Sequence, residues 1–273
     1  MRLEDFRDWL ALRRIATNPW AVVRYRKSHR EGQVLAVRLR DAGPLELRGG
    51  RADFHMFHRI FLRDEYRLNS TVTGALGCVV DLGANVGLFT ARIAPLAQRV
   101  IAYEPYPPHF AQLVKNVAGR ANVETVEAAV AGKSGTARLY EPLNEGQSGT
   151  HSLHPESGGY MSKRFHEVQA LSLDELFARH AIEVCDLLKL DVEGSEYEIL
   201  YGASADTLAR VRRIHGEYHD VRREDPRTRI AAFTRFLRDA GFEVEVVPHR
   251  RKENHGNFFA ARLPPKASVP AHA

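Results

Sequence analysis

Short apolar runs alternate with segments of helical periodicity from Cys78 onward. The apolar runs cover residues 78–83, 99–105, 123–130, 186–194, 213–220, 242–248 and 257–263. Apolar side chains repeat at helical spacing in residues 86–94, 109–117, 195–203 and 229–241. Because strands buried on both faces read as continuous apolar runs, the pattern predicts an α/β fold with a mostly parallel sheet between helices. The last two runs have only a short connection, which predicts an antiparallel hairpin at the sheet edge.

The first 70 residues differ in pattern and predict a small N-terminal extension of helices and a hairpin. One helix carries apolar residues at Leu3, Phe6, Leu10 and Ile15 and is stopped by Asn18–Pro19. A hairpin over residues 34–39 and 45–47 is followed by a second helix marked by Phe54, Phe57, His58 and Phe61. We therefore divide the chain into an extension (1–70), a main domain (71–263) and a frayed tail (264–273).

Composition and cysteine content exclude several classes of protein. Of the 273 residues, 44% are hydrophobic and 27% are charged, which is typical of a soluble globular protein. No run approaches about 18 apolar residues, so we expect no membrane-spanning helix, and the N-terminus is not typical of a secretory signal. Two cysteines cannot form a disulfide framework, so a reducing cytoplasm is the expected compartment.

The net charge is concentrated at the N-terminus. The chain carries +5, and residues 1–30 alone hold eight Arg and Lys residues against three acids. Trp9, Trp20 and Tyr25 lie among these basic residues. The arm is interpreted as a helix face that packs on the main domain, or else as a contact with an anionic lipid or glycolipid surface.

A glycine-containing loop follows the first apolar run, where α/β sheets bind ligands. Gly83 permits a tight turn, and Gly87 lets the next helix start close to the sheet. Asn85 stands where a dinucleotide-binding loop has its middle glycine, and the Asp81 carboxylate would repel a diphosphate but attract an ammonium group. Glu104 ends the second run and can accept hydrogen bonds from ribose hydroxyls. The loop therefore favours a ligand with a ribose and a cationic amino-acid end.

Several segments, in order along the chain, resemble the FkbM family of methyltransferases. They are DLGANVGLFT (81–90), AYEPYP (102–107), AAVAG (128–132), LSLDEL (171–176), LLKLDVEGSEYEIL (187–200) and GEYH (216–219). The resemblance extends from about Phe57 to Phe242 and implies a class I methyltransferase on a Rossmann-like fold. Members of this family are mainly O-methyltransferases of natural-product and sugar biosynthesis. The resemblance does not identify the methyl acceptor.

The resemblance implies S-adenosyl-L-methionine as cofactor, and the residues fit its three parts. At the methionine end we expect Asp81 and the loop residues Gly83, Ala84, Asn85 and Gly87. Glu104 is expected at the ribose. Ala128 and Ala129 leave room for the adenine, although small residues there are equally typical of core packing.

Residues after the fourth and fifth runs are candidates for the acceptor side. Asp191 ends a buried run and is expected to face the methyl group, in contact with the cofactor. His219 is the candidate general base, because removal of a hydroxyl proton is helped by a base of near-neutral pKa. Glu217 lies on the same side of the strand by alternation. Lys189, inside a buried strand, is interpreted as a partner of Glu217, or else as a lysine that reaches to the strand edge.

Other polar residues of these segments leave alternatives open. Glu196 is interpreted as complementing a helix dipole, and His215 as a core histidine. Asp191, Glu217 and His219 together could hold a divalent metal, but no tight ligand motif requires one, and we assign none. The polar segment 144–159, with His151 and Ser152, is interpreted as an active-site lid or a surface loop.

We therefore interpret the chain as an S-adenosylmethionine-dependent O-methyltransferase that modifies a hydroxyl of a small-molecule natural product, a sugar or a glycan. An RNA ribose methyltransferase is the first alternative, supported by the basic arm. A catalytically degenerate binding module is the second. Methylases of exocyclic amines would carry an Asn/Asp-Pro-Pro-aromatic turn at Asp191, and this turn is absent from the sequence. The oligomeric state is left open.

Overall fold

A seven-stranded sheet forms the centre of the protein. The computed structural model describes residues 3–28, 30–41, 43–143, 151–155, 161–220, 225–249 and 254–262. The strands are β3 (Leu76–Leu82), β4 (Ala97–Tyr103), β5 (Val123–Val126), β9 (Leu187–Leu190), β10 (Arg213–His219), β11 (Phe242–Pro248) and β12 (His255–Arg262). Their order is β11-β12-β10-β9-β3-β4-β5; β12 is antiparallel to both neighbours and the other pairs are parallel. The predicted α/β fold, a mostly parallel sheet with an antiparallel edge hairpin, is confirmed.

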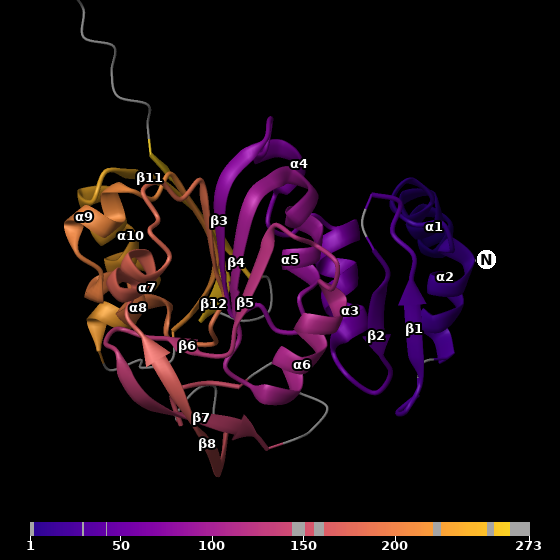
Figure 1. Cartoon of the computed structure of the whole chain (residues 1–273), viewed down its shortest axis with the longest axis horizontal. Coiled ribbons are helices and arrows are strands. Elements are labelled where there is room, and N and C mark those ends of the chain that lie inside the picture. Colours follow the sequence, from indigo (N-terminus) through magenta and orange to yellow (C-terminus); the bar gives the residue numbers. More distant parts are fainter. Residues whose placement is uncertain are drawn as a thin grey trace, which may run out of the picture.

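Helices cover both faces of this sheet (Figure 1). One layer holds α5 (Leu88–Ile93), a 3₁₀ turn (Ala94–Leu96) and α6 (Pro107–Asn116). The opposite layer holds α7 (Leu173–Arg179), α8 (Glu196–Gly202), α9 (Ala205–Ala209), a 3₁₀ turn (Pro226–Thr228) and α10 (Ile230–Asp239). Successive residues of β3 enter opposite cores, with Val79 in one and Val80 in the other, both fully buried. Burial on both faces explains the continuous apolar runs of the sequence.

The N-terminal extension contains two helices, α2 and α4, that the sequence does not predict. Its elements are α1 (Leu3–Ile15), α2 (Pro19–Ser28), β1 (Val34–Val37), β2 (Leu45–Arg48), α3 (Asp53–Phe57), a π-helical turn (His58–Leu62) and α4 (Leu68–Thr71). The antiparallel pairing of β1 with β2 confirms the hairpin. Pro19 ends the first helix as expected but also begins α2, because proline is favoured at the first position of a helix.

The extension and the main domain share one hydrophobic core. Leu12 of α1, Val22 of α2 and Leu47 of β2 belong to the same buried cluster as Phe89 of α5 and Leu113 of α6. The side chain of Asn116 ties the two parts together: its Oδ1 accepts from the backbone N–H of Glu46 at 2.8 Å, and its Nδ2 donates to Val86 O at 2.7 Å. The extension therefore packs against the α5–α6 layer, and the predicted boundary at residue 70 stays a prediction.

A second, three-stranded sheet lies next to the carboxyl ends of the main strands and was not predicted. It has the order β6-β8-β7, with β6 (Ala129–Val130), β7 (Gly135–Pro142) and β8 (Met161–Leu171). Much of β8 is exposed, so its polar side chains give no apolar run. Of the predicted loop 144–159, residues 144–150 and 156–159 lie outside the described residues.

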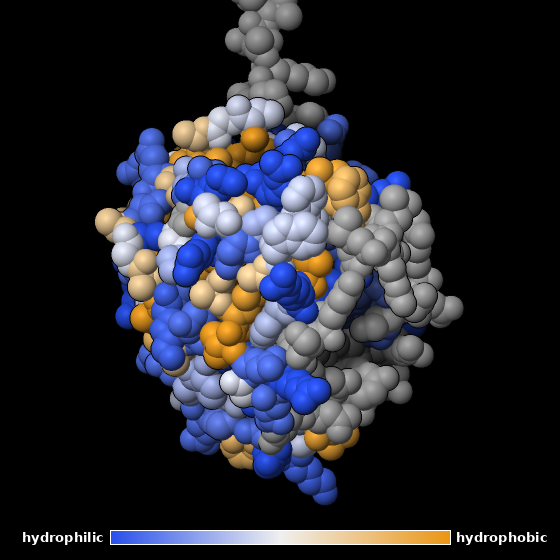
Figure 2. All heavy atoms as spheres, turned by 90° about the vertical axis from the view of Figure 1, so that its right-hand side faces the viewer, coloured by the Kyte–Doolittle hydropathy of each residue, from blue (hydrophilic) through white to orange (hydrophobic). Residues whose placement is uncertain are grey.

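The face formed by the N-terminal helices is mainly hydrophilic, with separate apolar groups among the polar ones (Figure 2). Phe6, Leu10 and Trp20 are exposed hydrophobic residues of α1 and α2, and the ring of Trp9 packs against Phe6 and Trp20. None of the helices in the described part of the chain has the length and apolar character that crossing a membrane requires. Both cysteines are free thiols. The anionic contact and the cytoplasmic location stay predictions.

The shared core predicts that a substitution in the extension destabilises the whole protein. Leu47→Ala removes a side chain that is 0% exposed, and we expect a loss of about 2–5 kcal/mol in the free energy of unfolding, measured with urea. Leu143→Ala, at a side chain that is 59% exposed, is the control and should change it little. An unfolding curve in which Leu47→Ala melts only the extension would contradict a single core.

Candidate active site

The loop after β3 is a tight turn that only glycine can make at its centre. Gly83 has φ +74°, and a Cβ atom there would lie 1.9 Å from the carbonyl oxygen of Asp191. The backbone N–H groups of Gly83 and Ala84 both donate to Tyr103 O, at 3.1 and 2.9 Å. Asn85 also has a positive φ, +51°, and its Oδ1 accepts from the next backbone N–H. The loop is thereby held over the carboxyl ends of β3 and β4.

Glu104 is a buried carboxylate that the loop positions with two backbone hydrogen bonds. Its Oε2 accepts from Asn85 N at 2.8 Å and its Oε1 from Tyr106 N at 2.9 Å. The residue is only 5% exposed, and this burial raises the pKa of Glu104 to about 7, against the lowering effect of the two N–H groups. Each carboxylate oxygen keeps a further acceptor site.

Glu104 lines a narrow pocket together with Gly83, Asn85, Ala128 and Ala129. The two alanines are buried, so the predicted small-residue wall is present. His109 and His151 also line this pocket; the ring of His151 stacks on Tyr106 with centroids 3.8 Å apart, and His109 meets both rings edge-on. Burial lowers the pKa of His109 to about 3, so its ring is neutral. These features suit a flat, uncharged ring system.

Two of the predicted cofactor residues, Asp81 and Gly87, make their contacts inside the protein and not at the pocket. Asp81 is fully buried: its Oδ2 accepts from Thr90 Oγ1 at 2.6 Å and its Oδ1 lies 3.1 Å from Lys189 Nζ. Gly87, with φ +81°, packs against Leu113, where a Cβ atom would come within 2.6 Å of Cδ1. In the described part of the chain, neither residue lines the pocket of Glu104 or the one beside it. The predicted contact of Asp81 with an ammonium group of the ligand does not fit this geometry.

Lys189 pairs with Asp81 and not, as predicted, with Glu217. Its ammonium group also donates to Gly83 O at 2.7 Å. Burial alone lowers the pKa of Lys189, but the Asp81 and Asp191 carboxylates raise it above its usual value. The prediction was wrong because Arg59 of the N-terminal extension pairs with Glu217 instead. The order of strands along the sequence does not reveal where the extension packs.

A second pocket adjoins the first and is lined partly by the extension. The two pockets share Gly83, Asn85, Asp191 and Glu193. Further lining residues of the second pocket are His55, Arg59, Glu65, Tyr66, Ala84, Lys189 and Glu217. Asp191 thus lies where the two pockets meet.

Arg59 and Tyr66 are site residues that the sequence did not indicate. Arg59 lies in the π-helical turn, a form of helix that is frequent at functional sites, and its guanidinium donates to both Glu65 and Glu217. The hydroxyl of Tyr66 donates to Asp191 Oδ2 at 2.9 Å. The charged stretch RDEYR (63–67) contains Tyr66 but not Arg59 and carries no recognisable motif, so the sequence offered no specific signal for either residue.

The pKa values of two neighbouring carboxylates in the second pocket, Asp191 and Glu217, are shifted in opposite directions. Burial works to raise the pKa of Asp191, but Lys189, His219 and Arg59 lower it below its usual value. For Glu217, burial and then the charge of Asp191 raise the pKa well above its usual value, against the lowering effect of Arg59. Of these two carboxylates, Asp191 is the one whose surroundings favour the ionised form more strongly.

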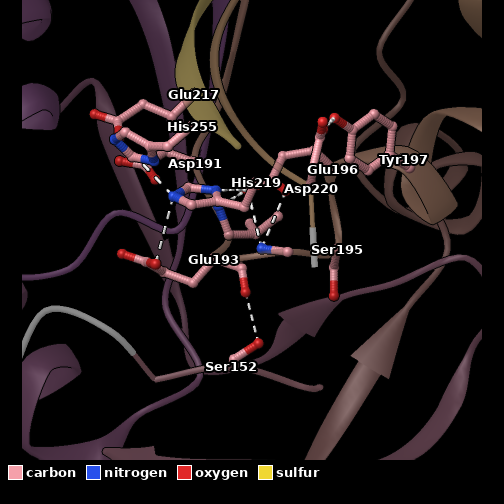
Figure 3. A network of polar contacts seen from close by, with 12 residues as sticks. Ser152, Asp191, Glu193, Ser195, Glu196, Tyr197, Glu217, His219, Asp220 and His255 are labelled. Atoms are coloured by element: carbon pink, nitrogen blue, oxygen red, sulfur yellow. Dashed lines mark hydrogen bonds and ion pairs between the residues drawn. The ribbon is translucent and has the colours of Figure 1, made fainter. Parts of the chain in front are cut away.

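His219 lies beside these carboxylates at the end of β10 (Figure 3). Its Nδ1 is 2.9 Å from Oε1 of Glu196, which is fully buried and also accepts from the backbone N–H groups of Val192 and Gly194. Burial lowers the pKa of His219, but Glu196 and Glu193 raise it well above its usual value. This direction disfavours the predicted role of a base of near-neutral pKa.

The remaining predicted residues have clear positions. His215 is buried, and its Nδ1 lies 2.8 Å from Tyr66 O, as expected of a core histidine. Ser152 donates from its hydroxyl to Glu193 O, and His154 lies 3.3 Å from Ser195 Oγ. The described piece of the predicted loop therefore packs on the turn after β9 and, through His151, lines the first pocket.

The sheet order and the loops at its carboxyl edge are those of a class I methyltransferase. Residues 81–244 match the family model described as the methyltransferase FkbM domain, and the chain belongs to this family. S-adenosylmethionine is the cofactor of the family, and the described residues fit it: Glu104 offers acceptor sites for ribose hydroxyls, and Ala128 and Ala129 bound a narrow pocket for the adenine.

Three relatives illustrate the range of the family. AMB antimetabolite synthetase AmbE of Pseudomonas aeruginosa is 28% identical over 226 residues, which is 70% of this chain but 11% of AmbE. The 31-O-demethyl-FK506 methyltransferase FkbM of Streptomyces tacrolimicus is 29% identical over 63% of this chain and 76% of its own. Hexuronic acid methyltransferase AglP of Haloferax volcanii is 30% identical over 64% of this chain and 66% of its own. The chain thus spans only a small part of AmbE and most of FkbM.

The pKa of Glu104 predicts that binding of S-adenosylhomocysteine, the form of the cofactor left after methyl transfer, depends on pH. Ribose hydroxyls donate best to the ionised carboxylate, and below about pH 7 binding must first remove its proton. We expect the affinity for S-adenosylhomocysteine, measured by calorimetry, to fall by up to about tenfold per pH unit between about pH 7 and pH 6.

Glu104→Gln is the matched control. It should bind S-adenosylhomocysteine more weakly than the parent by about 1.5–3 kcal/mol at about pH 8, because a charge-assisted hydrogen bond is lost. It should also lack the pH dependence. The assignment fails if the parent protein and this variant show the same affinities across the range.

Proposed function

We propose that the protein transfers a methyl group from S-adenosylmethionine to a hydroxyl oxygen of a small-molecule natural product, a sugar or a glycan. The observation that carries the proposal is the pair of adjoining pockets that meet at Asp191. One pocket fits the nucleoside of the cofactor. The other is lined by hydrogen-bonding groups, of which Arg59, Glu65 and Tyr66 come from the extension, and these suit an acceptor rich in hydroxyl groups.

The chain's own residues would position the acceptor and remove its proton. The cofactor supplies the electrophilic methyl group. Asp191, held by Tyr66 and kept ionised by Lys189, is the acceptor for the hydroxyl proton. Glu217, fixed by Arg59, is a second acceptor for hydrogen bonds from the substrate. Catalysis then rests chiefly on orientation, with proton removal by a positioned carboxylate. We assign His219 to positioning of the neighbouring carboxylates.

Two further observations support oxygen as the methyl acceptor. The names of the relatives FkbM and AglP refer to a 31-O position and to a hexuronic acid, and each describes that relative's own substrate. The carboxylates Glu65, Asp191, Glu193 and Glu217 of the second pocket would repel a phosphate backbone, which disfavours the RNA alternative.

A transfer assay with isotope-labelled S-adenosylmethionine tests the proposal. The full chain is incubated with a hexuronic acid glycoside, a neutral hexose glycoside, a hydroxylated macrolide, a primary amine and a short RNA. We expect label in a methyl ether of one of the first three, with the modified oxygen located by NMR. Transfer to nitrogen or to RNA alone would contradict it.

Asp191→Asn should impair turnover far more than cofactor binding. With the acceptor found in that assay, we expect kcat to fall by about 10²- to 10⁴-fold, because a positioned proton acceptor is lost. The affinity for S-adenosylhomocysteine should change only a few-fold by comparison. Asp206→Asn, at an exposed ion pair with Arg210, is the control for an aspartate charge removed elsewhere. Full activity of Asp191→Asn would remove its assigned role.

A further inference from the structure

Three potential metal ligands converge at the edge of the acceptor pocket (Figure 3). His219 of β10 and His255 of β12 are opposite each other in the antiparallel register, and Glu217 lies two residues before His219 on the same side of β10. Glu217 Oε2 is 3.3 Å from His255 Nε2 and 4.0 Å from His219 Nε2. One ligand atom from each residue lies within 4.8 Å of the others, a separation that one bound ion can span.

Contacts with Glu196 and Arg59 orient His219 and Glu217 so that their ligand atoms face one another. His219 Nδ1 lies 2.9 Å from the buried carboxylate of Glu196, so Nδ1 carries the hydrogen and Nε2 points into the cluster. A carboxylate that accepts the hydrogen of one ring nitrogen commonly orients an imidazole whose other nitrogen binds a metal ion. Arg59 binds Oε1 of Glu217, which leaves Oε2 facing the two imidazoles.

Negative charge around the cluster favours a cation there. Glu193 Oε2 lies 3.5 Å from His219 Nε2, and Asp191 and Glu196 form a second group of ligand atoms around the same histidine. Of the cations at this site, Arg59 is shared between Glu65 and Glu217, and Lys189 is shared with Asp81. The carboxylates therefore outnumber the cationic side chains in the described part of the site.

We propose that Nε2 of His219, Nε2 of His255 and Oε2 of Glu217 form a binding site for a divalent first-row transition-metal ion. Two imidazoles and one carboxylate suit Mn²⁺, Fe²⁺, Co²⁺ or Zn²⁺ and leave coordination positions open. Because Glu217, Asp191 and Glu193 also line the second pocket, the open positions are available to a hydroxyl of the acceptor. This role of the ion rests on the proposed function.

The ion would bind the acceptor hydroxyl. The bonds formed and broken in the methyl transfer would be the same with the ion as without it. The ion lowers the pKa of a coordinated hydroxyl, and the hydroxyl proton passes to the Asp191 carboxylate. An oxygen lone pair forms the new bond to the methyl carbon while the carbon–sulfur bond breaks and its electron pair stays on sulfur. The products are the methyl ether and S-adenosylhomocysteine, and Asp191 returns its proton to water.

Metal titration of the full chain tests the site without any acceptor. After chelation and removal of the chelator, the protein is titrated with Co²⁺, followed by visible absorption, and with Mn²⁺ and Zn²⁺, followed by calorimetry. We expect one ion per chain. Glu196→Gln should weaken binding by about 10- to 100-fold, because the carboxylate that orients His219 is lost. His255→Ala should weaken it by at least as much. His249→Ala, at an exposed histidine whose ring lies 5.5 Å from that of His255, is the matched control and should bind as the parent does.

Each outcome decides one part of the proposal. Equal thermal unfolding of the metal-free parent and of metal-free His255→Ala would show that this variant still folds, so that a loss of metal binding is a loss of the ligand. Absence of stoichiometric binding by the parent, or unchanged affinity in His255→Ala, would overturn the site. Metal binding with full hydroxyl methylation after chelation would overturn the ion's role. Metal binding without any hydroxyl methylation would overturn the proposed function and the ion's role, and would leave the site supported.

Discussion

The buried ion pair between Asp81 and Lys189 is the interaction on which the rest of the site depends. The two residues are register partners on the neighbouring parallel strands β3 and β9, and both are almost completely buried. Lys189 also donates to Gly83 O, so the pair fixes the loop that holds Asn85 and, through it, Glu104. Breaking a buried pair by removal of one partner costs about 3–5 kcal/mol. The position of the cofactor loop is therefore coupled to the stability of the sheet centre.

The same pair links the two pockets electrostatically. Lys189 is the leading cause that keeps the pKa of Asp191 below its usual value despite burial. The tight turn at Gly83 brings the loop against the carbonyl oxygen of Asp191, which leaves no room for a Cβ atom. This packing places a partly buried, ionised carboxylate beside the cofactor loop. The proposed hydroxyl methylation needs a proton acceptor at this place.

The main sheet could be predicted from the sequence because its strands are buried on both faces and read as apolar runs. Strand β8 is largely exposed and α2 is short and basic, so neither has such a signal. Glu104 could be placed because it directly follows β4, and Ala128 and Ala129 because they come shortly after the end of β5. The partners of Asp191 and Glu217 could not, since Tyr66 and Arg59 reach them across 125 and 158 residues of chain. Contacts of that length depend on how the extension packs, which periodicity does not encode.

A crystal structure of the complex with S-adenosylhomocysteine tests the central claim most directly. We expect ribose hydroxyls on the Glu104 carboxylate, the adenine against Ala128 and Ala129, and the sulfur directed toward the meeting point of the two pockets at Asp191. A ligand bound with its ribose away from Glu104, or with its sulfur directed away from Asp191, would contradict it.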